Sequence, residues 1–336
     1  MFRSRRSFLK LLTYSVVIPS LSCVFLGCGE TKNANNQAEN QETAVASKVD
    51  KEIPIRIAYP SGMNGQISKA MEKAEIAKKN GLDAKFNFFQ YGPPMMEALA
   101  SGKVDAVITS LMPVTNFMSR NPGKAVVVAS LGNSSYSLMV PKDSSIKEVK
   151  DLRGKTIAVS FGSDSHLDLL KLLKDSNLNP KSDVNLLNTQ PNELQLAFER
   201  GFANAIAIRQ PQVLQMQKKF DARIIHTWPF RYVSIMRSDY LEKYPQAKER
   251  YIQSLRESIL FTATHKEQAS NWFSEQIRVD PAVIRKVSED DPNYKVAKLE
   301  DVSVEVTPDV KKTLEDWAKF SYEVGMTKKQ VDWNWK

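Results

Sequence analysis

The sequence has few of the residues on which covalent and metal chemistry depend. Only 2 cysteines and 3 histidines occur among 336 residues, and both cysteines, Cys23 and Cys28, lie near the N-terminus. Neither H-E-x-x-H nor H-x-H occurs, and no glycine-rich phosphate loop is present. These absences argue against a zinc site. If Cys28 carries a lipid as the first mature residue, no other cysteine is left to form a disulfide or act as a nucleophile. We therefore expect no metal, no cofactor and no catalytic residue.

A strong charge imbalance is lacking too. The 47 Lys and Arg residues against 38 Asp and Glu residues give a net charge of +9. Four basic residues and no acid lie within positions 1–27, so the remainder carries about +5. No basic helix interleaved with aromatic residues is present, which argues against nucleic acid as a partner. A hydrophobic content of 42% supports a full core in one large domain or two lobes.

The N-terminus has the pattern of an export signal. Arg5 and Arg6 precede an apolar run over residues 11–26, which is short for a membrane span and contains Pro19. The paired arginines followed by Phe-Leu-Lys resemble a twin-arginine signal, which implies export of a folded bacterial protein. We expect residues 1–27 to be a cleaved signal peptide and the polar residues 28–52 to be a disordered tether.

Gly27-Cys28 resembles a lipobox, in which the cysteine becomes the first mature residue and carries a lipid on its thiol. Leu26 departs from that pattern, which prefers a small residue there. Cys23, after Ser22, is the poorer alternative. The resemblance implies a lipoprotein anchored through Cys28.

An internal repeat organises the rest of the chain. Residues 93–108 return in degraded form as residues 191–206, with Gly102 and Gly201 lying 99 positions apart. Each copy opens on proline, continues as a short helix, reaches a glycine suited to a left-handed helix end and enters a buried strand. A helix followed by a core strand is half of a parallel βαβ unit. The repeat predicts two similar α/β lobes with a cleft between them.

Alternating strand and helix patterns fill out these lobes. Strands are predicted over residues 55–59, 84–91, 104–109, 125–131, 156–159, 185–188, 203–208 and 223–226. Segments 135–140 and 231–236 are expected to cross between the lobes, and helices over 66–79, 248–265, 267–278 and 308–324 complete the pattern. We expect the first part of lobe one at 53–137, lobe two at 138–234, and the return strand with C-terminal helices at 235–336.

Three stretches carry a resemblance to a known family. They are Gly102-Lys103-Val104-Asp105-Ala106, the run from Val149 to Val159, and Gly162-Ser163 before a helix. Over about residues 53–236 the chain resembles the periplasmic substrate-binding proteins of nitrate, sulfonate and taurine ABC importers. The resemblance implies a type II periplasmic binding protein fold, whose two lobes close on a small molecule and deliver it to a permease with its ATPase.

The chain also departs from that family. An Asp-Ala pair and a Trp-x-Pro are common after the second repeat unit, whereas this chain has Asn204-Ala205 and Arg209-Gln210-Pro211. A guanidinium therefore replaces an aromatic wall, which leaves the fold expectation intact but opens the identity of the ligand.

The position at which parallel α/β sheets bind their ligands indicates which residues of this chain are candidate ligand contacts. Ligands lie beyond the carboxyl ends of the strands, where loops lead into helix N-termini that favour anions. The predicted substrate-binding residues are Tyr59, Ser61, Ser110, Phe161, Ser163, Ser165, His166 and Arg209. Structural alternatives stay open: the serines could cap helices, Arg209 could pair with a surface acid, and Tyr59, Phe161 and Tyr136 could belong to the core.

These patterns predict a monomeric solute-binding lipoprotein of an ABC importer. It would be lipid-anchored to the bacterial membrane, facing the periplasm or the cell exterior. A small organic anion such as a sulfonate is the favoured ligand. A neutral heterocycle such as a pyrimidine precursor, and a ligand-sensing surface lipoprotein, stay open as alternatives. An enzyme resembling thiamine-pyrimidine synthases is disfavoured, because their cysteine-rich iron motif is missing.

Overall fold

The computed structural model describes residues 51–333 and 335. The predicted export signal at Arg5 and Arg6 and the predicted lipid site at Cys28 lie outside the described residues. Within residues 51–333 and 335, no helix is both long and apolar enough to cross a membrane.

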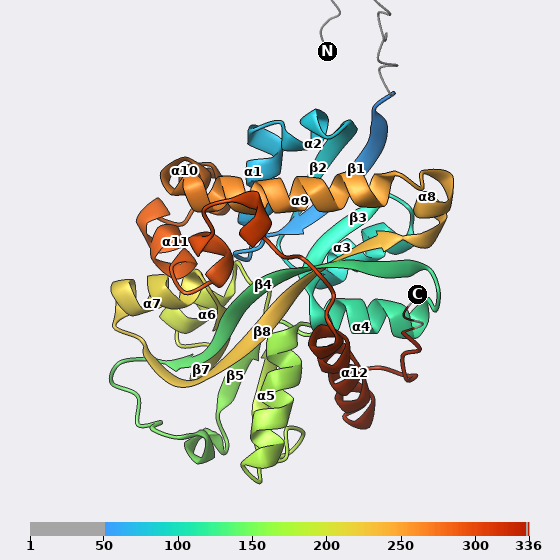
Figure 1. The fold of residues 1–336 in the computed structure, drawn as a ribbon. Coiled ribbons are helices and arrows are strands. Elements are labelled where there is room, and N and C mark those ends of the chain that lie inside the picture. Colours follow the sequence, from blue (N-terminus) through green and yellow to red (C-terminus); the bar gives the residue numbers. More distant parts are fainter. Residues whose placement is uncertain (1–50, 334, 336) are drawn as a thin grey trace, which may run out of the picture. The chain divides into compact units, whose positions relative to one another are not determined.

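Eight strands form one continuous sheet (Figure 1). They are β1 (Ile53–Pro60), β2 (Leu82–Phe89), β3 (Ala106–Ser110), β4 (Ala125–Val140), β5 (Thr156–Val159), β6 (Asn185–Asn188), β7 (Ala205–Arg209) and β8 (Arg223–Arg237). The order across the sheet is β2-β1-β3-β8-β4-β7-β5-β6. Within it, β2-β1-β3 and β6-β5-β7 are two parallel triads of the same design.

The long strands β4 and β8 connect the triads and run antiparallel to each other. The end of β8 pairs with β3, whereas the end of β4 pairs with β7. The β4–β8 register shifts between Ser130 and Asn133, around Gly132, whose φ is +97°. This arrangement is the predicted two-lobe α/β fold, with two strands crossing between the lobes.

Helices pack on both lobes. They are α1 (Gly65–Lys73), α2 (Ile76–Lys79), α3 (Gly92–Ala100), α4 (Leu111–Arg120), α5 (Asp164–Asp175), α6 (Leu194–Glu199), α7 (Gln212–Phe220), α8 (Ser238–Lys243), α9 (Ala247–Thr264), α10 (Lys266–Ile277), α11 (Pro281–Ser288) and α12 (Pro308–Glu323). Short 3-10 segments occur at Val149–Leu152, Pro292–Lys295 and Leu299–Asp301. Helix α9 packs against α1, α2 and α10, which places the C-terminal helices on lobe one as predicted (Figure 1).

The core lies along the faces of the two triads. Central-strand residues Ile57 and Ile157 are completely buried, as are Ala106 and Ala205, the repeat residues on the neighbouring strands. Each copy of the repeat packs apolar residues against the same face of its own triad. Because equivalent positions are buried in both lobes, similar residues recur there and the repeat is visible in the sequence.

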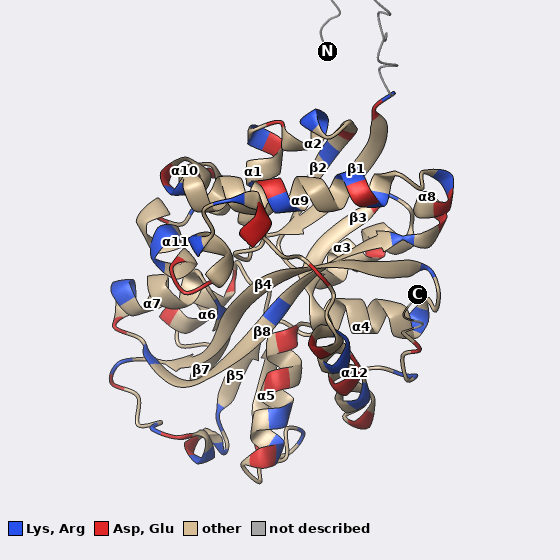
Figure 2. Cartoon of the chain, viewed as in Figure 1, with Lys and Arg blue, Asp and Glu red and all other residues tan. Residues whose placement is uncertain are grey.

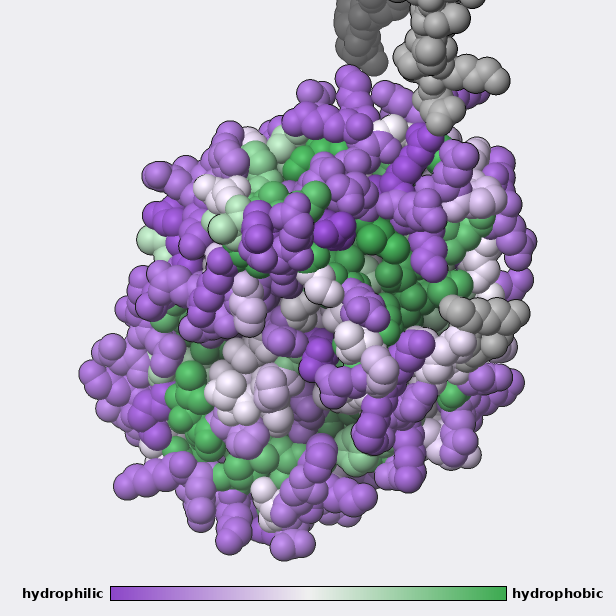
Figure 3. All heavy atoms as spheres, in the orientation of Figure 1, coloured by the Kyte–Doolittle hydropathy of each residue, from purple (hydrophilic) through white to green (hydrophobic). Residues whose placement is uncertain are grey.

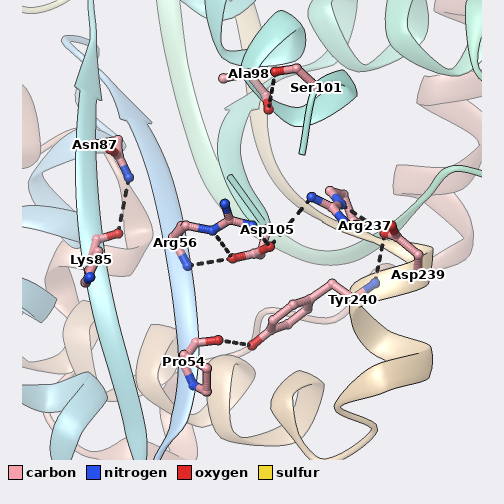
Figure 4. Close-up of polar contacts among 10 residues, drawn as sticks. All are labelled: Pro54, Arg56, Lys85, Asn87, Ala98, Ser101, Asp105, Arg237, Asp239 and Tyr240. Carbon is pink, nitrogen blue, oxygen red and sulfur yellow. Dashed lines mark hydrogen bonds and ion pairs between the residues drawn. The ribbon is translucent and has the colours of Figure 1, made fainter. Parts of the chain in front are cut away.

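Polar contacts at the beginnings of the strands also repeat. Asp105, whose side chain is almost fully buried, accepts hydrogen bonds from the Arg56 backbone N–H at 2.9 Å and from Arg56 Nε at 2.8 Å (Figure 4). Arg237 approaches the same carboxylate to 3.8 Å. In lobe two, Asn204 Oδ1 accepts the Thr156 N–H at 2.9 Å. Within the part of the chain that the structure describes, no guanidinium donates to Asn204, so a neutral amide suffices there.

Local structure departs from the sequence expectation at three places. The helix predicted over 66–79 is interrupted at Glu75, which adopts φ +54°, so it forms two helices. Segments 125–131 and 135–140, predicted as separate strands, join in β4, and 223–226 joins 231–236 in β8. Polar residues at 132–135 interrupt the apolar pattern, but antiparallel partners continue across them.

Candidate functional site

The loops after the parallel strands of both lobes meet at a seam between the lobes. Ser61 follows β1 and Gln90 follows β2, while Ser160 and Thr189 hold the equivalent positions in lobe two, 99 residues later. The hydroxyl of Ser61 donates to the Gln90 carbonyl at 2.9 Å, and that of Ser160 donates to the Thr189 carbonyl at 2.8 Å. Each serine therefore fixes the loop geometry of its own lobe.

Arg209 joins the two lobes. It ends β7 in lobe two, and its Nη2 donates to Ser61 Oγ and to the Gln90 carbonyl of lobe one, both at 2.7 Å. No acid among residues 51–333 and 335 forms a salt bridge with Arg209, so its surface-pair alternative is wrong. An uncompensated guanidinium at a seam favours a ligand that brings an anion.

Ser110 makes the matching contact in the opposite direction. It ends β3 in lobe one, at the repeat position of Arg209, and its hydroxyl donates to the Asp164 carboxylate of lobe two. The Met112 N–H, at the N-terminus of α4, donates to the same carboxylate at 3.1 Å. Asp164 is fully buried, and burial raises its pKa to about 6, opposed by these hydrogen bonds. A carboxylate of the protein thus occupies the anion position at α4.

Helix capping does not explain the seam serines. Ser110 and Ser163 precede α4 and α5, but their side-chain oxygens accept no capping hydrogen bond from the first turn. Ser163 Oγ instead donates to the Ser160 carbonyl at 2.6 Å and lies 2.9 Å from Ser165 Oγ. The simple capping alternative is therefore wrong for these two residues, and the hydroxyls of Ser163 and Ser165 lie buried at the seam.

The remaining predicted residues lie in different surroundings. Tyr59 is 2% exposed, contacts Phe88 edge to face, and lines neither seam cavity described below. Phe161 is 37% exposed and stacks on His166, with 4.3 Å between ring centroids. Burial lowers the pKa of His166 to about 4, so that ring is neutral at pH 7. The structure thus places Tyr59 in the interior and does not bring Phe161 or His166 into those cavities.

Two cavities lie at the seam. A small one of about 20 Å³ is lined by Tyr136, Ser163, Ser165 and Arg209 together with neighbouring residues. A larger one of about 170 Å³ lies beside the crossing strands and is lined by residues that include Met63, Ser134, Gln210 and Tyr294. The first holds about one water molecule, whereas the second is comparable to engineered cavities that bind benzene.

Another hollow lies away from the seam. It measures about 860 Å³ and is lined by β4, α9 and residues near the C-terminus, including Val126, Ile252 and Trp333. Figure 3 shows apolar side chains gathered between α9 and the crossing strands. Charged groups are distributed over the outer faces of the helices rather than gathered in one basic stripe in this view (Figure 2). We assign the site to the seam, because unpaired polar atoms of Asn64, Tyr232 and Arg209 converge there, whereas the groove contains only Trp333 Nε1 among the buried unpaired side-chain atoms of the described residues.

Sequence reasoning missed several seam residues. Asn64, Asp164 and Tyr232 are buried there, and Tyr136, named above only as a residue that could belong to the core, lines the small cavity. Asp164 lies between Ser163 and Ser165, so the serine motif could have indicated it. Nothing in the pattern of β8 distinguishes Tyr232 from a core aromatic. Among the described residues, no group of three or more His, Cys, Asp and Glu side chains could hold a metal ion.

The crossing strands, paired triads and seam define a two-lobe binding protein fold, and comparisons with known proteins agree. A solved alkanesulfonate-binding protein SsuA from Xanthomonas axonopodis pv. citri, bound to MOPS, superposes with a TM-score of 0.70 at 20% identity, over 84% of this chain and 96% of that one. The aliphatic sulphonate binding protein SsuA from Escherichia coli gives a TM-score of 0.67 at 22% identity, over 83% and 90%. At such identities the likeness establishes the fold.

Sequence comparison identifies the family. The pattern of the family described as "NMT1/THI5 like" matches residues 78–269, so the chain belongs to that family. A Bacillus subtilis (strain 168) protein named as binding aliphatic sulfonates is 24% identical over 94% of this chain and 92% of its own length. The taurine-binding periplasmic protein of Escherichia coli (strain K12) is 30% identical over 60% of this chain and 64% of its own length.

Proposed function

We propose that the protein is the extracytoplasmic solute-binding subunit of an ABC importer and captures a small organic sulfonate between its lobes. The observation that carries this proposal is Arg209, which reaches from lobe two to Ser61 and Gln90 of lobe one without an acidic partner among the described residues. A ligand oxyanion would exchange these neutral acceptors for charge-assisted hydrogen bonds, which are stronger. The sulfonate-binding and taurine-binding relatives support the same ligand class.

Binding rather than catalysis fits the seam. Its polar groups are serine hydroxyls, a guanidinium and a carboxylate already held by donors, and the relatives are named as binding proteins. We further propose a monomer that works with a permease and an ATPase, without nucleic acid. In this proposal Arg5 and Arg6 direct export to the periplasmic or outer side of the membrane, and lipid on Cys28 anchors the protein there.

Calorimetric titration of the wild-type protein with ethanesulfonate, 2-aminoethanesulfonate and a neutral aminopyrimidine tests the ligand class. We expect at least one sulfonate to bind and Arg209→Ala to weaken it about 10- to 100-fold, because a hydrogen bond to a charged group contributes about 1.5–3 kcal/mol. Arg200→Ala, an exposed change in the same lobe, is the control and should bind as wild type.

Two results would contradict the proposal: no binding of either sulfonate, or equal sulfonate affinity in the wild type and Arg209→Ala. Binding of the aminopyrimidine alone would favour a neutral-ligand receptor instead.

A further inference from the structure

A further cavity lies outside the seam, within the helical layer that packs on lobe one. It measures about 80 Å³ and has room for several water molecules or for one small ion. Three cationic side chains line it: Lys266 at the start of α10, Arg285 on α11 and Lys295 at the end of the 3-10 segment Pro292–Lys295. Each comes from a different element, so the fold, and not one helix, brings the three charges together.

Among the described residues, no acid forms a salt bridge with any of these three cations. Arg285 Nη1 donates instead to the neutral hydroxyl of Ser270 at 3.1 Å. The acid in the cavity wall, Glu289, is paired with Lys286 at 2.7 Å. The pKa of Glu289 is lowered mainly by Lys286 and more weakly by the two lysines of the cavity, so both act on this wall. Unpaired like charges repel each other, and an anion between them would be stabilised.

The wall of the cavity is polar and buried, which distinguishes it from a patch of solvated lysines. Gln66, Thr262, Ser288 and Tyr294 all line it and are almost completely buried. The Ser288 hydroxyl donates to the side-chain oxygen of Gln66 at 3.3 Å. The side-chain nitrogen of Gln66, a donor, has no partner among the described residues. A donor left unpaired in a buried residue is unfavourable, and a bound oxyanion would satisfy it.

The chemistry of the lining favours a small anion. Guanidinium, ammonium and amide groups donate hydrogen bonds, and only Glu289 in the lining opposes a negative charge. The guanidinium can meet two oxygens of one oxyanion, while the ammonium groups of two other elements can meet the remaining oxygens. A tetrahedral oxyanion, whose oxygens point in several directions, therefore fits better than a planar carboxylate or a metal cation.

We propose that Lys266, Arg285 and Lys295 form a second anion site, separate from the seam, that binds one inorganic oxyanion of the sulfate and phosphate class. The site does not depend on the proposed function, because it shares no residue with the small seam cavity. It does adjoin the seam: Ser288 and Tyr294 line both this cavity and the seam cavity of about 170 Å³. A bound oxyanion should therefore hold α10, α11 and the 3-10 segment together beside the seam.

Calorimetric titration with sodium sulfate and with sodium phosphate, at an ionic strength held constant with sodium chloride, tests this site. We expect one equivalent to bind here in the wild type with a Kd of about 1 mM or tighter. Lys266→Ala combined with Lys295→Ala should weaken this binding at least about 10-fold, because two charge-assisted hydrogen bonds are lost. Glu289→Gln should instead strengthen it about 3-fold, because it removes the opposing charge.

The matched control is Lys248→Ala combined with Lys298→Ala. These two lysines are exposed and do not line the cavity, so the control removes the same charge and should bind sulfate as wild type. Arg209→Ala should also retain this binding, because the seam is a separate site. Lys266 and Lys295 are themselves exposed, so their replacement should not prevent folding.

Hydrogen exchange provides an independent readout. Sulfate should slow exchange in α10, α11 and the 3-10 segment of the wild type, but not in the double variant of the cavity lysines. Three results would overturn the second anion site: no saturable binding of either anion, equal weakening in the two double variants, or sulfate binding that is lost only in Arg209→Ala. Each of these results would leave the proposed sulfonate function standing.

Discussion

Single residues show how one framework serves two lobes with different chemistry. Asp105 and Asn204 hold equivalent positions, and each side chain accepts a backbone N–H of its triad's central strand, from Arg56 of β1 and from Thr156 of β5. Asp105 also faces Arg56 and Arg237, which require a negative charge (Figure 4). Among the described residues, no guanidinium forms a hydrogen bond with the Asn204 side chain. The departure from the family's Asp-Ala pair therefore keeps the structural hydrogen bond and drops only the charge.

Replacement of Asp105 tests this difference. Asp105→Ala should lower the free energy of unfolding by about 2–3 kcal/mol, because it leaves a backbone N–H and two guanidinium groups without their buried acceptor. Asn204→Ala, at the exposed equivalent position, should cost about 1 kcal/mol. Urea unfolding measures both, and equal losses in the two variants would refute the charge argument.

The buried carboxyl group of Asp168 should make the stability of the folded protein depend on pH. It is 7% exposed, its Oδ2 lacks a partner, and burial together with Asp164 raises its pKa to about 8. Between about pH 4 and pH 8 the folded protein holds a proton that the unfolded chain has lost. Stability conferred by this proton is therefore complete below about pH 4 and is lost as the pH rises through 8.

Asp168→Asn should remove that loss. We expect the variant to be about 1–3 kcal/mol more stable than wild type at pH 8.5, to match it near pH 4, and to show a flatter profile between those values. Thermal unfolding across this range measures the effect. A variant less stable than wild type at pH 8.5 would show that the ionised carboxylate is needed.

At the scale of elements, the seam is built from two equivalent strand ends. Ser110 ends β3 and donates to Asp164 of the other lobe, while Arg209 ends β7 and donates to Ser61 of the other lobe. Each lobe thus reaches across from the same position of its triad. The first contact joins the start of α4 in lobe one to the start of α5 in lobe two and requires no ligand. We call it the latch, because we expect it to hold the two lobes together in the ligand-free protein.

Asp164→Ala should release this latch. Without the carboxylate, the Ser110 hydroxyl and the Met112 N–H lose their acceptor and can form hydrogen bonds only with water. The ligand-free lobes should therefore move apart, and the radius of gyration should increase. Asp175→Ala, at the exposed end of the same helix, is the control and should leave it unchanged. Small-angle scattering of both variants decides, and identical radii would show that the latch does not hold the lobes together.

Elements were more predictable than contacts between them. The repeat around Gly102 and Gly201 was visible because burial and left-handed backbone leave local signals, and both glycines do adopt positive φ. The break at Glu75 was not visible, because neither glycine nor proline marks it. Asn64 and Tyr232 were missed for a further reason: they come together at the seam from segments far apart in the sequence.

At the scale of the molecule, the two matched triads place their strand ends at one seam. Asp290 and Asp291 line the larger cavity there, and Asp164 is held by Ser110. Ser61, Ser110, Ser163, Ser165 and Arg209 lie at this seam, because strand ends of a parallel sheet share one edge. Their role in binding stays a prediction. Chemistry that depends on both lobes, such as the Asp164 contact, could not be derived from either half alone.

The most direct test of the central claim is hydrogen exchange of the wild-type protein with and without saturating ethanesulfonate. A ligand held between the lobes should slow exchange in the loops after β1 and β3 and, at the same time, in the loops after β5 and β7. Protection confined to one lobe, or found only in the groove beside α9, would contradict capture at the seam.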